Sequence, residues 1–470
     1  MTETKQHSQH KQARGGASAS AGERPARNGA GDRAARDGGG GRGGRDGAGG
    51  PALRTEDKVR LGLLALPTLA LALSITMVST YLGEVARRYT HQTIIIGVIV
   101  GGEGVMALWI PLFAGAWSDR LRTRIGGRLP FVLAGTIPAA VALALIGFLG
   151  TLVLVAAMAG VFFAFYFVAY EPYRAMYPDL VSDESKAGRA QSTQAVARGL
   201  GTGLALLGGG LLLSVARPLP FVVSAFVMVV AVAAFVVLIV RRGLVGRRPD
   251  DAEGGERPRE LARRVAGLLV RHPALRAYFI ANSLWEMALA SMKAFVILYL
   301  TVGLKYSLPS ASLMIGAVAF VILVGAGASG KAADRFGHIK VVRIALWAYG
   351  LGYLLLIFTT SRPLMGVAVP FIAVGGGTVM TMSYALLMPL MPEGEHGALT
   401  GFYSMSRGVG VVAGPILAGL AIALTRAQVF SNTQGFQAMW IICAAAALAS
   451  LLFLGRLRDA EKDREALESE

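Results

Sequence analysis

The stretch Gly115–Phe131, GAWSDRLRTRIGGRLPF, is a short, densely basic segment between two long apolar runs. A fainter copy, GKAADRFGHIK, follows at Gly330–Lys340. One offset of 215 residues aligns three identical pairs: Gly115 with Gly330, Asp119 with Asp334, and Arg120 with Arg335. A repeat at this distance in a chain of 470 residues indicates two duplicated halves.

The segments on either side of these basic stretches are strongly apolar. The chain is 54% hydrophobic and 16% charged, and from residue 60 onward it contains twelve continuous apolar runs. Each run is near the ~20 residues that a helix needs to cross a bilayer, and none alternates as a strand would. Their approximate spans are 60–82, 92–116, 129–149, 151–173, 190–214, 218–240, 274–301, 309–330, 339–360, 363–388, 398–424 and 435–455. The sequence predicts an all-α membrane protein with twelve transmembrane helices in two six-helix pseudo-repeats.

The distribution of basic residues predicts the topology. The formal charge of +17 would suit a nucleic-acid-binding protein, but the basic residues concentrate in the tails and in alternate segments between the runs. The segment after run six alone carries nine arginines between Arg241 and Arg271. Positive-inside bias therefore predicts that these segments and both termini are cytoplasmic, in the plasma membrane. We expect the lipid bilayer as a partner, and no nucleic acid.

The same features divide the chain into five parts. Residues 1–57 consist mainly of Gly, Arg, Ala and Asp, and we expect a disordered cytoplasmic tail. Two six-helix bundles at 58–240 and 273–456 flank a cytoplasmic linker at 241–272, and a cytoplasmic tail follows at 457–470. A second repeat supports equal halves, because one offset of 209 residues aligns five further pairs. Those pairs are Gly188 with Gly397, Arg198 with Arg407, Gly199 with Gly408, Gly201 with Gly410, and Gly210 with Gly419.

Twelve spans in two halves, with G-x-x-x-D-R after runs two and eight, resemble the major facilitator superfamily over about 60–456. Within it, Ser118-Asp119-Arg120, Gly127-Arg128 and Pro130-Phe131 resemble the sucrose and glycoside cation symporters. Pro172-Tyr173-Arg174-Ala175 followed by Asp179 resembles them as well. The plant-type sucrose symporters carry a proton-donating Asp nine residues before that proline, where this sequence has Phe163. The resemblance implies alternating access, with a conformational role for Asp119, Arg120, Arg128, Asp179, Asp334 and Arg335. The repetition of Arg198 at Arg407 favours a structural role for at least one of them, as an arginine paired with Asp or Glu between the halves, and we group Arg407 with the conformational residues.

Charges inside the apolar runs are the candidates for transport chemistry, since each costs at least ~2.5–3.5 kcal/mol at the centre of a bilayer. Glu103 lies midway along run two in GGEG, where glycines permit close approach of another helix. A carboxylate in an apolar environment binds a proton more readily, so we expect Glu103, and second Glu286, to couple proton movement. The alternative is a carboxylate fixed in a structural ion pair.

Residues of runs four, five and seven are candidates for binding the substrate. On run seven, Asn282, Glu286 and Lys293 share one helical face, although Lys293 could instead extend toward the membrane interface. Run four carries a tyrosine stripe whose rings and hydroxyls suit a sugar; packing is the alternative, and Tyr177 is expected in the interfacial aromatic belt. The predicted substrate-binding residues are Tyr166, Tyr170, Arg174, Arg198, Asn282 and Lys293.

These features predict a secondary active transporter, not an enzyme. The preferred function is proton-coupled symport of a sugar or glycoside by a monomer, driven by a proton or sodium gradient without a cofactor. Six histidines, none in an H-E-x-x-H pattern, indicate no metal centre. The alternatives are a proton-driven drug or metabolite exporter of the same fold, and a non-transporting membrane sensor or scaffold.

Overall fold

The computed structural model describes residues 55–121, 123, 125, 127–180, 184–243, 258–391 and 399–469. Within these ranges twelve helices are long and apolar enough to cross a membrane, which confirms the predicted all-α fold with twelve spans. The tail expected at 1–57 lies outside the described residues up to position 54.

The spans are continuous helices with few interruptions. The N-terminal six are α1 (Thr55–Ala86), α2 (Thr93–Arg120), α3 (Leu129–Ile146), α4 (Leu152–Leu180), α5 (Glu184–Val215) and α6 (Leu219–Arg241). The C-terminal six are α8 (Pro273–Leu298), α9 (Leu308–Phe336), α10 (His338–Phe358), α11 (Arg362–Leu387), α12 (Leu399–Thr425) and α13 (Met439–Ser469). Five of them, α3, α6, α8, α9 and α11, have proline at the first or second position, where its missing N–H costs no helical hydrogen bond. Short elements are the π-helix η1 (Tyr299–Gly303) and the 3₁₀-helices η2 (Met388–Leu390), η4 (Ser431–Thr433) and η5 (Phe436–Ala438).

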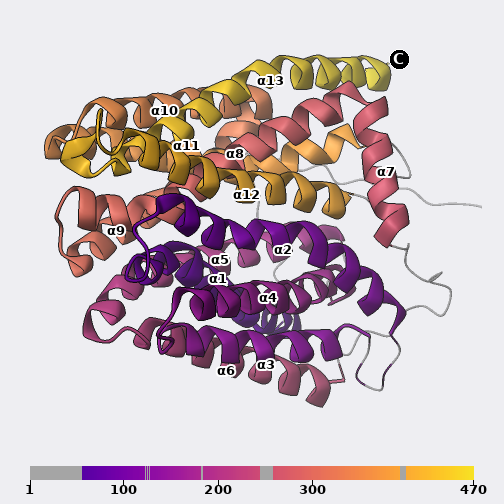
Figure 1. Cartoon of the computed structure of the whole chain (residues 1–470). Helices are drawn as coiled ribbons and strands as arrows, with labels where there is room; N and C mark the ends of the chain where they lie inside the picture. The colour runs from indigo at the N-terminus through magenta and orange to yellow at the C-terminus, as the bar shows by residue number, and fades with distance from the viewer. Residues whose placement is uncertain are drawn as a thin grey trace, which may run out of the picture. The chain divides into compact units, whose positions relative to one another are not determined.

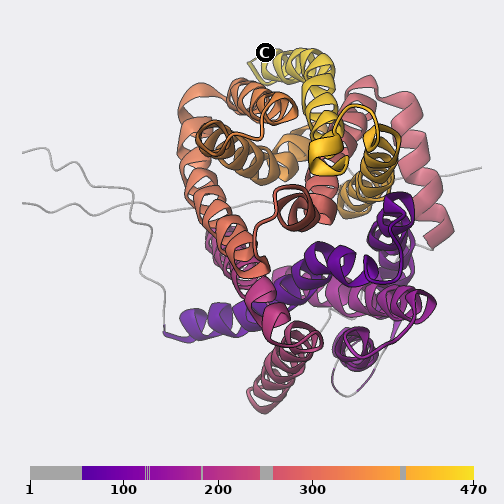
Figure 2. The same cartoon turned by 60° about the vertical axis from the view of Figure 1, so that its left-hand side comes forward.

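Helices α1–α6 form one group and α8–α13 another, stacked one above the other in Figure 1 and seen closer to end-on in Figure 2. The two groups pack through three main helix pairs, α2 with α12, α5 with α9, and α1 with α8. Three buried hydroxyl groups inside the spans are satisfied locally, since Ser74, Thr136 and Ser224 donate to the carbonyl four residues earlier.

Three segments differ from the sequence prediction. The linker expected at 241–272 contains a further helix, α7 (Pro258–Arg271), while its residues 244–257 lie outside the described part. The segment after run eight is not a loop: only Gly337 separates α9 from α10, and its φ of 86° suits glycine. The tail expected at 457–470 continues α13 without a break as far as Ser469.

Candidate functional site

Glu103 of α2 is buried where three helices meet, with 6% of its surface exposed. The Ser79 hydroxyl of α1 lies 2.5 Å from Glu103 Oε2. On the other side, Arg407 Nη2 of α12 lies 3.5 Å from Glu103 Oε1. The carboxylate predicted to couple protons therefore has a neutral hydrogen-bond partner in its own half and a cationic partner in the other half.

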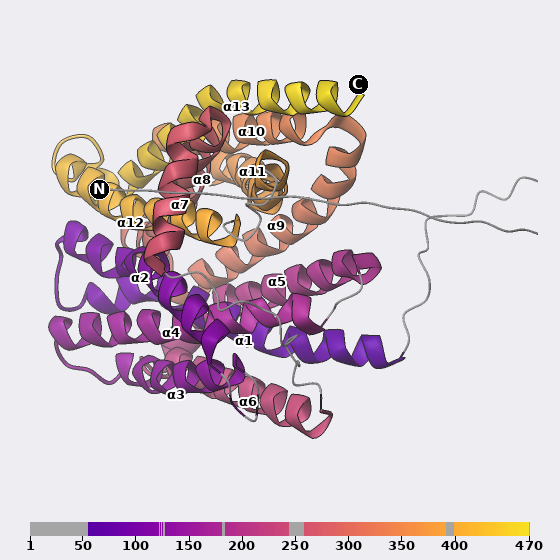
Figure 3. The same ribbon diagram turned by 90° about the vertical axis from the view of Figure 1, so that its right-hand side faces the viewer.

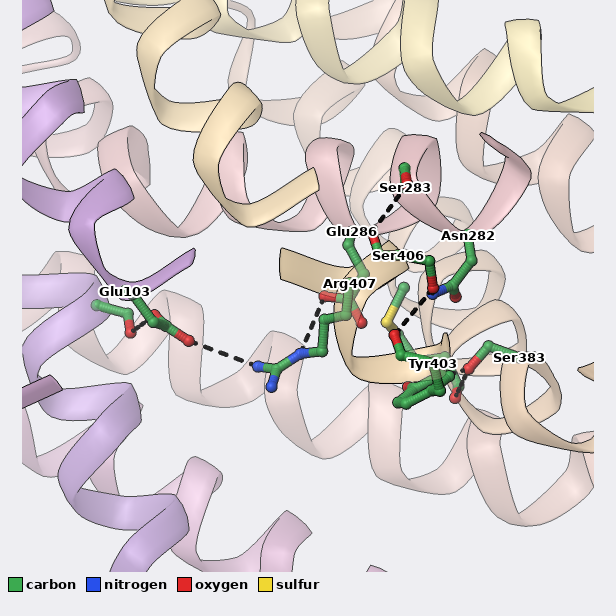
Figure 4. Close-up of polar contacts among 10 residues, drawn as sticks. Glu103, Asn282, Ser283, Glu286, Ser383, Tyr403, Ser406 and Arg407 are labelled. Atoms are coloured by element: carbon green, nitrogen blue, oxygen red, sulfur yellow. Dashed lines mark hydrogen bonds and ion pairs between the residues drawn. The ribbon is translucent and has the colours of Figure 1, made fainter. Parts of the chain in front are cut away.

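Arg407 also binds a second carboxylate. Its Nε lies 3.5 Å from Oε2 of Glu286 on α8, and Glu286 is 4% exposed. Figure 4 shows the Arg407 guanidinium between the two carboxylates. The sequence grouped Arg407 with the conformational residues, as an arginine that pairs with an acid between the halves; the structure shows such a pair with Glu103 and a second pair with Glu286. One arginine thus joins an acid of the N-terminal half to an acid of the C-terminal half.

Glycines explain why these side chains meet. Gly104 follows Glu103, and Gly408 follows Arg407. A β-carbon on Gly104 would lie 2.7 Å from the Gly408 carbonyl oxygen and 2.5 Å from the Val412 nitrogen. Such contacts are possible only between backbones without side chains, so α2 and α12 cross closely here. The crossing brings the adjacent Glu103 and Arg407 within reach of each other.

Two hydrogen bonds join α8 to α12 beside Arg407. Asn282 Nδ2 donates to Ser406 Oγ at 2.8 Å, and the Ser283 hydroxyl donates to the Ser406 carbonyl at 2.8 Å. Asn282 is fully buried, and in the described part of the chain its Oδ1 has no hydrogen-bond partner. The predicted substrate residue Asn282 therefore also holds α12 in register with α8. It does so at Ser406, the residue before Arg407.

Lys293, two turns from Glu286 on α8, lines the same cavity as both carboxylates, Arg407 and Ser79. This position agrees with a cavity-facing lysine and not with one extended toward the interface. The cavity is about 20 Å³, which is room for about one water molecule. Both carboxylates are buried, whereas 30% of the Arg407 side chain is exposed, and a ligand of sugar size needs more room than this cavity gives.

The tyrosine stripe of α4 has two parts with different surroundings. Tyr166 and Tyr170 stack, with ring centroids 5.4 Å apart and planes 15° apart. The Arg174 guanidinium lies 6.0 Å from the ring centroid of Tyr384 on α11, across the boundary between the halves. Tyr384 in turn packs edge-on against Tyr403 of α12 at 5.4 Å. Arg174, one of the predicted substrate residues of α4, thus faces an aromatic pair of the C-terminal half.

The second part of the stripe, Tyr173 and Tyr177, has a structural role. Tyr173 and Tyr177 are buried, and both hydroxyls bond to Thr68 and to the Leu64 carbonyl of α1. The expectation that Tyr177 belongs to an interfacial aromatic belt is wrong, because its ring packs inside the N-terminal half. These tyrosines fix α4 against α1 and thereby fix the position of Arg174.

Arg198 of α5 is exposed, unlike its repeat partner Arg407. Electrostatic interactions still connect Arg198 to Tyr170 and to the buried Glu171 of α4. At the 215-residue offset of the first repeat, the position of Glu103 corresponds to Val318 on α9. The duplicated arginine therefore meets no duplicated acid, and the two halves are chemically unequal.

The remaining predicted gating residues lie near the basic ends of the helices. Arg128 Nη1 donates to the Ala175 carbonyl, which ties the segment after α2 to the end of α4. Asp334 and Arg335 are exposed in the last turn of α9, where the Arg335 guanidinium lies 5.2 Å from the Phe336 ring centroid. The side chains of Asp119, Arg120 and Asp179 lie outside the described residues.

Sequence reasoning missed Ser79, Tyr384 and Tyr403. A serine or tyrosine in an apolar run is common, and only the position of its helix shows that it meets Glu103 or Arg174. Over the described ranges, no group of three or more His, Cys, Asp or Glu side chains could hold a metal ion.

A family model described as Major Facilitator Superfamily matches residues 64–330 and 287–470. The chain belongs to this superfamily. It is a multi-pass membrane transporter of the superfamily's type. An uncharacterized superfamily-type transporter of Bacillus subtilis (strain 168), YfiU, is 30% identical over 86 residues, which are 18% of this chain and 17% of that protein.

Solved structures of superfamily transporters share the fold. The nucleoside transporter NupG has a TM-score of 0.65 at 14% identity, covering 86% of this chain and 99% of its own. A bacterial homologue of the human lysosomal transporter Spinster, inward-facing and occupied, has a TM-score of 0.65 at 12% identity, covering 87% and 98%. The POT family transporter PepTSo has a TM-score of 0.66 at 13% identity, covering 86% of this chain and 98% of its own.

Proposed function

We propose that this transporter couples proton movement to the import of a sugar or glycoside by alternating access. The observation that carries the proposal is the bridge from Glu103 through Arg407 to Glu286, which joins the two halves by ion pairs. A group that binds a proton at this position changes the contact between the halves each time it loads or releases that proton.

The coupling step follows from the geometry at Glu103. When Glu103 is ionised, Arg407 pairs with both carboxylates. When Glu103 is protonated, its ion pair with Arg407 is lost, and Ser79 remains as a neutral hydrogen-bond partner. The Arg407 Nη2 that is released can then donate to a substrate hydroxyl, while Nε stays paired with Glu286. Proton loading and substrate binding therefore favour each other.

The aromatic surface near this cluster supports a sugar as the substrate. The stacked pair Tyr166 and Tyr170 and the edge-on pair Tyr384 and Tyr403 offer flat apolar faces and hydroxyl groups, and Arg174 lies against Tyr384. Sugar rings present both surfaces as well, with C–H groups on their faces and hydroxyls around the edge. The P-Y-R-A segment at 172–175, by which the chain resembles glycoside symporters, supplies Arg174 at the same place.

The orientation of the transporter in the membrane is part of the same proposal. The basic segments lie in the cytoplasm, and the membrane is the plasma membrane. The contacts of α2 with α12, such as that of Gly419 with Thr93, lie toward the opposite face, where α2 begins and α12 ends. The structure then corresponds to a carrier whose outer face is closed.

The test begins with a thermal-shift screen of sugars and glycosides on the purified protein. Any stabilising compound is then used in counterflow and in uptake into proteoliposomes with an acidic exterior. We expect accumulation that stops when a protonophore collapses the gradient. Export of the compound under the same gradient would favour the drug or metabolite exporter instead, and binding without flux would favour the sensor.

A further inference from the structure

Helix α7 lies between two membrane spans and has no part in the transport site. Span α6 ends at Arg241, and span α8 begins at Pro273. A single residue, His272, separates the end of α7 at Arg271 from the start of α8. With 14 residues, α7 is about 21 Å long, which is too short to cross the hydrocarbon. Its C-terminal end is therefore held at the boundary of the membrane by the start of α8.

The direction of α7 places it along that boundary. In Figures 1 and 3 it runs steeply across the neighbouring spans instead of parallel to them. In Figure 2 the rose-coloured helix lies at the edge of the bundle, beside α2 and α12. It packs against α8 and also against α2 and α12, which carry Glu103 and Arg407.

One face of α7 is used for that packing and the other is free. Val265 and Leu268 are buried, with 0% and 5% of their surface exposed. Arg259, Arg263 and Val270 are exposed on the other face, with Val270 at 76%. Steps of four and seven residues put these three side chains on one stripe of the helix.

We propose that this stripe binds the anionic phospholipid headgroups of the membrane leaflet at the basic face of the protein. Two arginines match lipid phosphates in charge and geometry, because the planar guanidinium can donate two parallel N–H hydrogen bonds to two phosphate oxygens. Val270, the residue of the stripe nearest to α8, enters the boundary between headgroups and acyl chains. A water-soluble partner would not explain an exposed valine at the end of a helix that is fixed to the membrane surface. The proposal rests on the membrane-spanning fold and not on the substrate.

A fluorophore on Val270→Cys tests this inference in the full chain. The native Cys443 is fully buried, so the label reacts at position 270 alone. The labelled protein is placed in phosphatidylcholine vesicles that contain a nitroxide-labelled lipid, either phosphatidylglycerol or phosphatidylcholine. We expect stronger quenching by phosphatidylglycerol. Each arginine near an anionic surface changes lipid affinity by about fivefold, so Arg259→Gln with Arg263→Gln should remove most of this preference.

Two further variants separate charge from folding. Arg259→Lys with Arg263→Lys should keep the preference for phosphatidylglycerol. Arg88→Gln with Arg426→Gln removes two exposed arginines far from α7 and should not change it. Equal quenching by the two lipids would overturn headgroup recognition. Absence of quenching by either lipid would show that the stripe faces water or another protein, and would overturn the proposal entirely.

Discussion

Arg407 lies between two buried carboxylates of different halves, so its single positive charge faces up to two negative charges. The two distances of 3.5 Å are long for ion pairs, and 30% of the Arg407 side chain is exposed. A pair of this length is easily broken, because little hydrogen-bond energy is lost when one acid accepts a proton. That property suits a carrier that must open and close at every cycle.

Replacing Glu103 with Gln keeps the size of the side chain and removes its exchangeable charge. We expect proton-driven accumulation of the substrate to be lost while counterflow continues, because exchange needs no net proton movement. The matched control is Glu84→Gln, a partly buried acid of α1 that pairs with Arg87, the residue directly after this helix. Survival of proton-driven accumulation in Glu103→Gln would exclude this residue as the coupling group.

Replacing Arg407 with Gln should lower the stability of the protein as well as its transport. It leaves two neighbouring buried carboxylates without their cation, at a cost of about 2 kcal/mol for a partly exposed arginine. Adding Glu103→Gln should recover part of the lost apparent Tm, since one unpaired charge is then removed. Arg198→Gln, the equivalent arginine of the other repeat, is exposed and should change Tm less. Equal losses for the two arginines would contradict the bridging role.

At the scale of single residues, the sequence predicted that Glu103 and Glu286 are functional but did not show that Arg407 is the partner of both. Glu103 and Glu286 stand out because a charge in an apolar run is costly. Arg407 looked like a latch residue, because a repeat shows only that two arginines occupy equivalent helices. Which of them meets an acid depends on the backbone crossing beside it, and that crossing is a tertiary contact.

At the scale of helices, the two glycines on either side of Glu103, Gly102 and Gly104, have different surroundings. A β-carbon on Gly104 would lie 2.7 Å from the Gly408 carbonyl oxygen, whereas one on Gly102 would touch only Phe163, at 4.0 Å. The sequence predicted close approach at this motif, and the structure shows that Gly104 provides it. Residues 258–271 gave no comparable signal, because a short basic amphipathic helix in a polar linker resembles the linker around it.

Gly104→Ala and Gly102→Ala therefore form a matched pair. Overpacking at the α2–α12 crossing should cost about 1–3 kcal/mol in the closed arrangement, which shifts the balance between the two faces by about fivefold or more. We expect Gly104→Ala to reduce the transport rate and to expose the outer ends of α2 and α12 to a membrane-impermeant thiol reagent at an introduced cysteine. The Gly102→Ala variant should keep the transport rate and the thiol labelling of the unsubstituted protein. Similar behaviour of the two variants would mean that the crossing does not control closure.

At the scale of the whole transporter, the two halves meet through small and polar residues on one side. Ser312 of α9 lies 2.9 Å from the Tyr81 hydroxyl and donates to the Leu206 and Leu207 carbonyls of α5. Nearby, a β-carbon on Gly316 would overlap Leu207, so α5 and α9 also cross closely. The number of spans and their division into halves follow from hydropathy and repeats, but which ends are closed does not. A carrier that alternates has one sequence and at least two such arrangements.

A disulfide across α5 and α9 should stop that alternation. A β-carbon on Gly210 would lie 2.6 Å from the Ser312 β-carbon, and disulfides need about 3.8 Å, so a separation of about 1 Å lets Gly210→Cys bond to Ser312→Cys. We expect oxidation to abolish transport and a reductant to restore it in the same vesicles, because the bond holds the two halves closed at this side. The single variants account for any loss caused by the substitutions themselves. Undiminished transport in a sample that is fully cross-linked would show that α5 and α9 stay together throughout the cycle, and the movement would then have to occur elsewhere.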